Sequence, residues 1–312
     1  MKLMSVFKPL QIPEGDKQMK KDFFLPSEDG KIELGVSLYE VDNPKATIQF
    51  THGMTGHRGV YDQVNQYLAD KGYAVIASDN RGHGDSVNDF YRVGYMDHYE
   101  NNVNDQLTVW EYMDKLYPDI PHYSLSHSFG SMIMRVFMQE HDDLFEKMIF
   151  TGAPHYVEGS AIAAELLESV VKISRNEYFI PERIVNRVKS NFHADVDYFP
   201  TDDLRVVFQE DEKVVPTYTV RGVQVIIKTL IQLTVEADYQ VKNPDLQILS
   251  LSGTDDFWAG NSSDVKGAMA ILRDVGYSHV TMSIYPNMKH EILFERHPFN
   301  IVYRDLLRFL EN

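Results

Sequence analysis

The sequence contains no cysteine among its 312 residues. A disulfide framework, a thiolate-bound zinc ion and a cysteine nucleophile are therefore excluded. Long apolar runs are absent as well, because no stretch approaches the roughly 20 apolar residues of a membrane span. Lys8, Pro9 and Pro13 interrupt the first residues too early for a signal peptide. We therefore expect a soluble protein in the reducing cytoplasm.

Positive charge is scarce. The 30 lysines and arginines stand against 46 aspartates and glutamates, which gives a formal net charge of −16. A nucleic-acid-binding surface needs a basic field, and anionic lipid attracts basic segments. The balance therefore argues against nucleic acid as a partner and against electrostatic docking on membranes. We interpret the acidity as a solubilising surface.

Short apolar runs alternate with amphipathic stretches in the first half of the chain. A pair of strands flanks the turn at residues 27–30. Further strands are predicted at residues 46–50, 73–79, 122–128 and 147–154, and helices at residues 60–72, 101–118 and 131–141. This alternation predicts a parallel sheet with helices on both faces.

The alternation stops between about residues 155 and 241. This part contains predicted helices at residues 161–174, 181–192 and 222–238, and no convincing strand. Strands return at residues 246–253 and 279–286, with helices at residues 267–276 and 299–312. We therefore expect an α/β core in two parts, residues 1–155 and 242–312, interrupted by a helical insertion over residues 156–241.

Ser128 stands in the motif Ser126-His-Ser-Phe-Gly-Ser131, between a predicted strand and a predicted helix. This is a near match to G-x-S-x-G, in which a strained strand-to-helix turn lifts a serine hydroxyl above the sheet. Ser126 replaces the first glycine and is still small enough for the turn. Because S-x-S-x-G arises often by chance, the strand-turn-helix placement is what favours Ser128 as a nucleophile.

A serine hydroxyl needs a base to take its proton, and the base needs an acid to orient it. Folds that use this motif place the acid and then the histidine at the ends of later strands. His290 lies just beyond the last predicted strand, and Asp255 and Asp256 directly follow the strand at residues 246–253. The spacing leaves the choice between the two aspartates open, and a surface histidine is the simpler interpretation of His290 taken alone.

The loop Thr51–His57, THGMTGH, follows the predicted strand at residues 46–50. In such folds this loop supplies one backbone N–H to the oxyanion of the tetrahedral intermediate. The expected donors are the N–H of Met54 and the N–H of Phe129, the residue after Ser128. We interpret His52 as a residue that orients the loop and takes no part in the chemistry.

Four blocks of the sequence together resemble one family. They are HGMTGHRGVYDQVNQYLADKGYAVIASDNRGHGDS, SHSFGS, SGTDD and YPNMKHEIL. In this order they are similar to the monoacylglycerol lipase and lysophospholipase branch of the α/β hydrolases, above all to its bacterial members, from about residue 23 onwards. The resemblance implies the α/β-hydrolase fold: a mostly parallel central sheet flanked by helices, with a helical cap inserted after the sixth strand.

The resemblance also assigns roles to residues. It makes Ser128 the nucleophile and His290 the base. It makes Asp256 the acid, because the family's aspartate is the third residue after the glycine that ends the strand, here Gly253. Met54 and Phe129 match the oxyanion donors. A block that looks structural in the family matches Asp79, Arg81, Gly82, His83 and Gly84.

In the family the cap forms an apolar entrance for acyl chains. The aromatic residues that this suggests as substrate contacts are Phe129, Phe257, Trp258, Tyr178, Phe179 and Phe192. Plain core packing is the alternative for each cap residue taken singly. Members of the family often have proline and a small aliphatic residue where Phe257 and Trp258 stand, which leaves the details of the substrate open.

We therefore expect a carboxylic ester hydrolase that works through an acyl-enzyme on a lipid-like ester such as a monoacylglycerol or a lysophospholipid. The partner is a small-molecule ester, no cofactor or metal is needed, and any membrane or micelle contact is transient and made through the cap. A short-chain carboxylesterase, an acyltransferase or thioesterase, and a non-catalytic ligand-binding member of the fold are the alternatives. A metal site is disfavoured because H-E-x-x-H from His290 would require histidine where Phe294 stands. Acyl length, head group and oligomeric state stay open.

Overall fold

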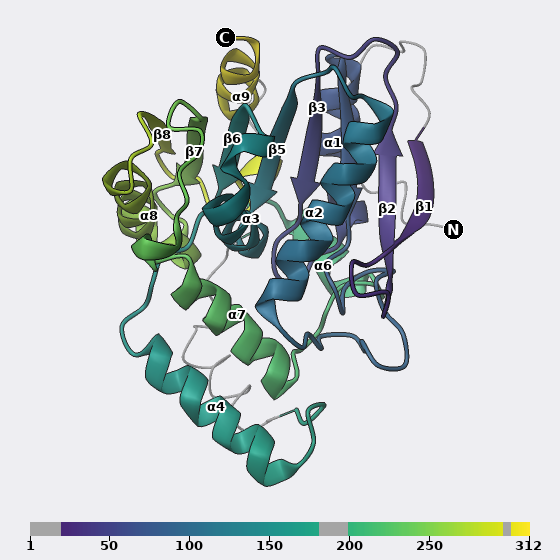
Figure 1. The fold of residues 1–312 in the computed structure, drawn as a ribbon, viewed down its shortest axis with the longest axis vertical. Helices are drawn as coiled ribbons and strands as arrows, with labels where there is room; N and C mark the ends of the chain where they lie inside the picture. Colours follow the sequence, from purple (N-terminus) through teal and green to yellow (C-terminus); the bar gives the residue numbers. More distant parts are fainter. Residues whose placement is uncertain (1–19, 181–198, 296–300) are drawn as a thin grey trace.

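The computed structural model describes residues 20–180, 199–295 and 301–312, and these residues form one eight-stranded sheet (Figure 1). The strand order is β1-β2-β4-β3-β5-β6-β7-β8. The first two pairings, β1 with β2 and β2 with β4, are antiparallel, and the other five are parallel. The strands are β1 (Lys20–Pro26), β2 (Glu33–Tyr39), β3 (Ala46–Thr51), β4 (Tyr73–Ser78), β5 (His122–His127), β6 (Lys147–Thr151), β7 (Gln247–Gly253) and β8 (His279–Tyr285). The predicted, mostly parallel sheet is confirmed.

Helices cover the sheet on both faces. The core helices are α1 (Asp62–Asp70), α2 (Tyr99–Leu116), α3 (Phe129–His141), α8 (Ser263–Asp274) and α9 (Ile301–Glu311). One buried apolar cluster joins α1 and α9 to the sheet, and a second joins α3 and α8 to strands β6 and β7. Strands β3 and β4 are buried at every residue. This explains the nearly continuous apolar run of β4, YAVIAS. Strand β3, ATIQFT, alternates apolar with polar residues, and its polar side chains are buried as well.

Among the described residues, three helices lie between β6 and β7 and form the cap. They are α4 (Ser160–Ser174), α6 (Asp202–Glu210) and α7 (Val220–Gln232). Figure 1 shows α4 and α7 running side by side beyond one end of the sheet. The helical cap after the sixth strand is thereby confirmed. Helix α6 was not predicted, and the predicted helix at residues 181–192, with Phe192 in it, lies outside the described residues.

An apolar cluster ties the cap to the core. It combines Phe129 and Ile133 of helix α3 with Val225 of helix α7 and with Val215 and Tyr218 from the segment that precedes α7. Short 3-10 turns complete the described elements: η2 (Arg58–Tyr61), η3 (Asp142–Leu144), η4 (Glu236–Asp238), η5 (Phe257–Ser262) and η6 (Ile292–Phe294).

The strand order has a topological switch point at the carboxyl ends of β3 and β5. These two strands are neighbours in the sheet, yet the chain leaves β3 towards β4 on one side and reaches β5 on the other. Ligands of open α/β sheets bind at such a switch point, beyond the carboxyl ends of the strands. The loop Thr51–His57 and the turn at Ser128 both lie there.

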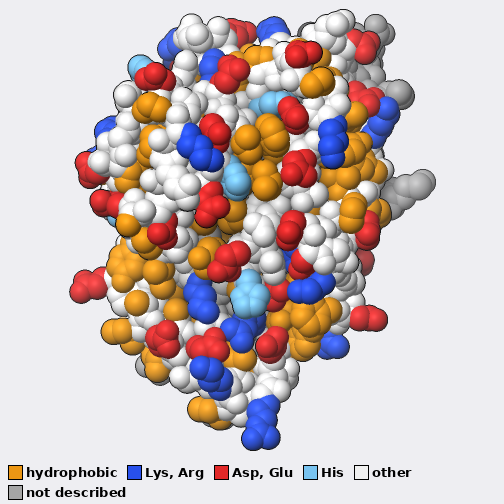
Figure 2. All heavy atoms as spheres, in the orientation of Figure 1, with side chains coloured by type: hydrophobic (Ala, Val, Ile, Leu, Met, Phe, Trp, Pro, Cys, Tyr) orange, Lys and Arg blue, Asp and Glu red, His pale blue; other side chains and the backbone are white. Residues whose placement is uncertain are grey.

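The face of the molecule in Figure 2 carries acidic and basic side chains interspersed with patches of hydrophobic ones. In the part of the chain that the structure describes, no helix combines the length and the apolar character that crossing a membrane requires.

A buried ionic cluster holds the loop that follows β4. The Arg81 side chain is fully buried, and its guanidinium donates to Asp105 (Nη2–Oδ1 2.8 Å) and to Asp29 (Nη1–Oδ2 2.9 Å). Burial raises the pKa of Asp105 to about 6, although Arg81 opposes this rise. Arg81 therefore balances the buried negative charge of Asp105 on helix α2. Through Asp29 it also joins that helix to the turn between β1 and β2.

We predict that Arg81→Met lowers the free energy of unfolding by about 3–5 kcal/mol, because it leaves Asp105 buried and unpaired. The exposed pair Arg304–Asp305 (3.2 Å) provides the control, since Arg304→Met should cost less than about 1 kcal/mol. Urea titration at pH 7 measures both. Equal losses in the two variants would contradict the role of the cluster.

Candidate active site

Ser128 lies in a strained turn between β5 and α3. Its backbone has φ 51° and ψ −116°, a region that a residue with a side chain rarely adopts and that costs about 1–3 kcal/mol. Two bonds hold the turn: the N–H of Ser128 donates to Thr151 O (2.9 Å), and Ser131 Oγ donates to Ser128 O (2.6 Å). The turn directs the Ser128 side chain to the carboxyl edge of the sheet, where 8% of the residue is exposed.

Gly130 brings this turn close to the loop after β3. A Cβ atom at Gly130 would lie 2.3 Å from Thr51 O and 2.7 Å from His52 O, and both of these are backbone atoms. No side chain fits there, so glycine is required for helix α3 to begin beside the loop. The close approach places the start of helix α3, with Phe129, beside the loop that contains Met54.

His290 and Asp256 lie in line with Ser128. His290 Nε2 is 2.8 Å from Ser128 Oγ, and His290 Nδ1 is 2.8 Å from Asp256 Oδ1. Asp256 follows β7 and also accepts from the N–H of Ala259 (3.0 Å), which closes turn η5. The structure therefore brings together the three residues that the sequence singles out. Asp255 makes a different contact, with Thr254 Oγ1 (2.9 Å) at the surface.

Gly152 allows the imidazole to reach the serine. Strand β6 lies between β5 and β7 in the sheet, so His290 must pass over the end of β6 to meet Ser128. A Cβ at Gly152 would lie 2.9 Å from His290 Nδ1 and 3.2 Å from Asp256 Oδ2, and Gly152 has φ +54°. Both the space and the backbone conformation at this position call for glycine.

Charges around His290 set its protonation. Burial alone would lower the pKa of His290, but the facing carboxylate of Asp256 and the neighbouring Glu291 outweigh it and raise the pKa above the ordinary value. Burial would raise the pKa of Asp256, yet the imidazole and the N–H of Ala259 hold it below the ordinary value. The site therefore favours an ionised carboxylate beside a histidine of increased basicity.

The loop after β3 presents the N–H of Met54. The peptide group that contains this N–H also contains Gly53 O, which accepts a hydrogen bond from His52 Nδ1 (2.8 Å). His52 Nε2 in turn accepts from the N–H of Asn80 (2.9 Å), so the imidazole is neutral with its proton on Nδ1. Burial agrees with this state, because it lowers the pKa of His52 to about 3. In the described part of the chain, no acceptor faces the N–H of Met54 or that of Phe129.

A second buried carboxylate lies next to His290 and was missed by the sequence analysis. Glu291 Oε1 is 3.3 Å from His127 Nε2, and Glu291 Oε2 accepts from Tyr61 OH (3.2 Å). The rings of His127 and His290 have centroids 4.8 Å apart. Burial would raise the pKa of Glu291, but His127 and His290 hold it below the ordinary value. The signal in the sequence was the adjacency of His290 and Glu291, which the sequence analysis considered only as a metal motif.

The predicted substrate contacts fall in different environments. Phe257 and Trp258 directly follow Asp256 in turn η5, with their rings edge to face and with 37% of Phe257 exposed. Tyr178 packs against Tyr95, with ring centroids 4.7 Å apart. Phe129 and Phe179 differ in exposure, at 1% and 39%. The Phe129 side chain belongs to the apolar cluster between cap and core. This position agrees with core packing, the alternative to a substrate contact.

Comparisons with known proteins agree with this architecture. The chain is 26% identical to a monoglyceride lipase of Mus musculus over 251 residues, which is 79% of this chain and 76% of that protein. Its fold matches a carboxyl esterase from Bacillus coagulans with a TM-score of 0.82 at 19% identity, over 94% of this chain and 98% of the other. It also matches a monoglyceride lipase from Saccharomyces cerevisiae with a TM-score of 0.68 at 17% identity, over 96% and 97%.

A family model described as serine aminopeptidase, S33, matches residues 42–297. This range includes the loop after β3, the turn at Ser128, the cap and both strands that precede Asp256 and His290. The chain therefore belongs to this family of α/β hydrolases and is a serine hydrolase.

Proposed function

We propose that the protein hydrolyses carboxylic esters of lipid-like alcohols, such as monoacylglycerols or lysophospholipids. The observation that carries the proposal is the line Ser128–His290–Asp256, with both hydrogen bonds at 2.8 Å, at the switch point of the sheet. The similarity to a monoglyceride lipase over 79% of the chain supports the choice of substrate class.

Hydrolysis would follow two steps. Ser128 Oγ attacks the ester carbonyl while His290 Nε2 takes its proton, and Asp256 stabilises the imidazolium that forms. The N–H groups of Met54 and Phe129 hold the oxyanion, His290 returns the proton to the leaving alcohol, and an acyl-enzyme remains. Water then attacks the acyl-enzyme while His290 takes its proton. His290 returns this proton to Ser128 Oγ as the carboxylic acid leaves. The increased basicity of His290 favours the first proton transfer.

Apolar side chains lie beside the oxyanion loop, as the binding of an acyl chain requires. The Met54 side chain packs against the apolar cluster that helix α3 forms with the cap, which includes Ile133 and Val225. Hydrocarbon thus borders the point where the carbonyl would bind. Transfer of an acyl chain from water to apolar surroundings is favourable, whereas a charged acid moiety would have to give up its hydration.

The substrate class is tested with p-nitrophenyl esters of increasing acyl length, run beside monoacylglycerols, lysophospholipids and an aminoacyl p-nitroanilide. We expect monoacylglycerol or lysophospholipid turnover that Ser128→Ala lowers by several orders of magnitude. Ser124→Ala is the matched control, because Ser124 belongs to β5, the strand that leads to Ser128, and its buried hydroxyl has no partner among the described residues. A sharp preference for short acyl groups would replace the proposal with a short-chain carboxylesterase, and cleavage of the anilide alone would replace it with an aminopeptidase.

Asp256→Asn should lower kcat on the order of 10⁴-fold, because the amide no longer fixes the tautomer of His290 or balances the imidazolium. Asp255→Asn removes the same charge one residue away at the surface and should change kcat by roughly threefold or less. Steady-state kinetics of both variants on one ester makes the comparison. The opposite order of effects would mean that Asp255 is the acid.

Glu291→Gln should lower the pKa of the base, because one of the two carboxylates that raise it is lost. Activity requires neutral His290 and falls as the pH drops through its pKa, so the acid limb of kcat/KM should move to lower pH in this variant. The other groups that face the imidazole are Asp256, His127 and Ser128, and all three are retained. Asp255→Asn is the control, since it removes an exposed charge from the same neighbourhood. A limb that moves to higher pH, or moves equally in both variants, would refute the effect.

A further inference from the structure

The cap contacts the oxyanion loop directly, through the segment between α6 and α7. We name residues 211–219 the cap strap. Val215 N–H donates to Thr55 O (2.8 Å), and Thr55 N–H donates to Tyr218 OH (2.8 Å), so both backbone groups of Thr55 bond to the strap. Thr55 follows Met54 and has φ +68°, a strained conformation for threonine. The strap therefore holds the turn that presents the Met54 N–H.

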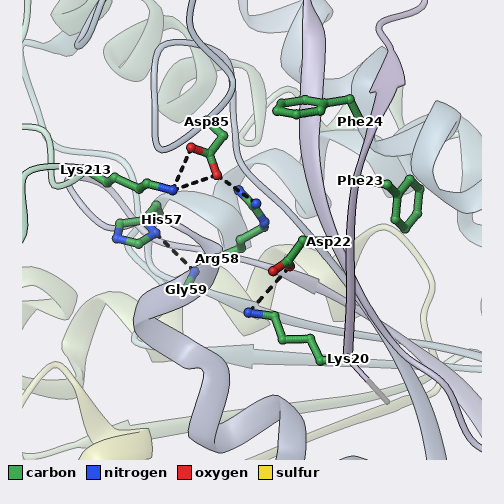
Figure 3. Close-up of a pocket in the computed structure, with 9 residues that line it drawn as sticks. All are labelled: Lys20, Asp22, Phe23, Phe24, His57, Arg58, Gly59, Asp85 and Lys213. Carbon is green, nitrogen blue, oxygen red and sulfur yellow. Dashed lines mark hydrogen bonds and ion pairs between the residues drawn. The ribbon is translucent and has the colours of Figure 1, made fainter. Parts of the chain in front are cut away.

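The two ends of the cap strap are fixed to the core by polar contacts. At the start, Asp211 Oδ2 lies 2.9 Å from His57 Nε2, and Lys213 Nζ lies 2.7 Å from Asp85 Oδ1. Figure 3 shows Asp85 between Lys213 and Arg58, at the edge of a cleft of about 320 Å³. At the other end, Thr219 N–H donates to Gly94 O (3.1 Å).

The cleft itself offers no free charge for a ligand. Each cationic side chain that lines it is bonded to a carboxylate: Lys20 to Asp62, Arg58 to Asp79 and Asp85, and Lys213 to Asp85. None of the predicted triad residues lines it. We therefore regard the cleft as the outer border of the contact between strap and core.

The hydrogen bonds of Tyr218 have a defined direction. His83 Nδ1 lies 2.8 Å from Arg81 O, and because a carbonyl only accepts, this nitrogen carries a proton. Burial lowers the pKa of His83 to about 3, so the ring is neutral and its Nε2 accepts. Tyr218 therefore donates to His83 Nε2 (2.7 Å), and its oxygen is free to accept from the Thr55 N–H. The hydroxyl has one partner for each role, and both Tyr218 and His83 are buried.

On the basis of the proposed function, we propose that Tyr218 is a positioning residue for the oxyanion hole, through which the docked cap fixes the direction of the Met54 N–H. Two peptide groups meet at Met54. The peptide group before its Cα is held from the core by His52, through Gly53 O, and the one after it is held from the cap by Tyr218, through the Thr55 N–H. Loss of the cap contact leaves this donor constrained from one side only.

The test compares Tyr218→Phe with the wild-type protein. A fluorophosphonate titration gives the number of active sites, so kcat is expressed per competent site. We expect kcat to fall about 10- to 100-fold, less than the loss of a whole oxyanion donor, while KM changes by roughly threefold or less. The affinity for a trifluoromethyl ketone, whose adduct with serine carries an oxyanion, should fall by about the same factor as kcat/KM.

Tyr277→Phe is the matched control. Its hydroxyl is also buried and donates to a single side chain, Asp142 Oδ2 (3.0 Å), but it lies in the cluster around α8. A merely structural role of Tyr218 would lower the melting temperature as in Tyr277→Phe and leave kcat per site and ketone affinity unchanged, which would overturn the inference. So would a loss confined to KM.

Asp211→Asn and Lys213→Met keep the test decisive if Tyr218→Phe does not fold. Both loosen the start of the strap without touching Tyr218, and both should lower kcat and ketone affinity together, by a smaller factor. Unchanged values in both would again overturn the inference. A wild-type protein that neither reacts with the fluorophosphonate nor hydrolyses esters would refute the proposed function itself, which distinguishes the two failures.

Discussion

Ser128 holds its left-handed backbone only because neighbouring strands enforce it. Its N–H bonds to the end of β6 at Thr151, and its helix begins against the carbonyls of Thr51 and His52, where only Gly130 fits. The strain of about 1–3 kcal/mol is thus offset by contacts with both adjacent strands. Because β6 also separates Ser128 from the loops after β7 and β8, the same packing requires the histidine to cross the strand end at Gly152.

The buried histidines around this turn differ in basicity. Burial lowers the pKa of His52 and of His83 to about 3, and a hydrogen bond from Nδ1 to a carbonyl oxygen fixes the tautomer of each ring. His290 is equally enclosed, but two carboxylates raise its pKa. Burial is common to all three, so the presence of a carboxylate partner decides which imidazole can take a proton near neutral pH.

Most of the fold follows from local sequence, and the site follows in part. Buried strands and amphipathic helices can be predicted from short apolar runs and from spaced apolar residues. Ser128 and His290 could be predicted from motifs at strand ends, whereas the choice of Asp256 over Asp255 required the resemblance to a family. Helix α6 was missed because its nine residues are fewer than the window over which helical periodicity is assessed, although Leu204, Val207 and Phe208 recur at helical spacing. The pairings of Glu291 with His127 and of Thr55 with Tyr218 could not be predicted, since they join residues far apart in the chain, 163 positions in the second case.

The cap changes how such a site should be understood. A cap that only covered the candidate active site would affect which esters enter, and substitutions in such a cap would change KM. Here the strap that leads into α7 bonds to both backbone groups of Thr55, one residue beyond the predicted oxyanion donor. Hydrogen-bond donors stabilise an oxyanion only when they are already oriented before charge develops. If Tyr218 has the proposed positioning role, docking of the cap and orientation of the donor share the same contacts. A change in how the cap docks should then alter both the choice of ester and the stabilisation of the oxyanion.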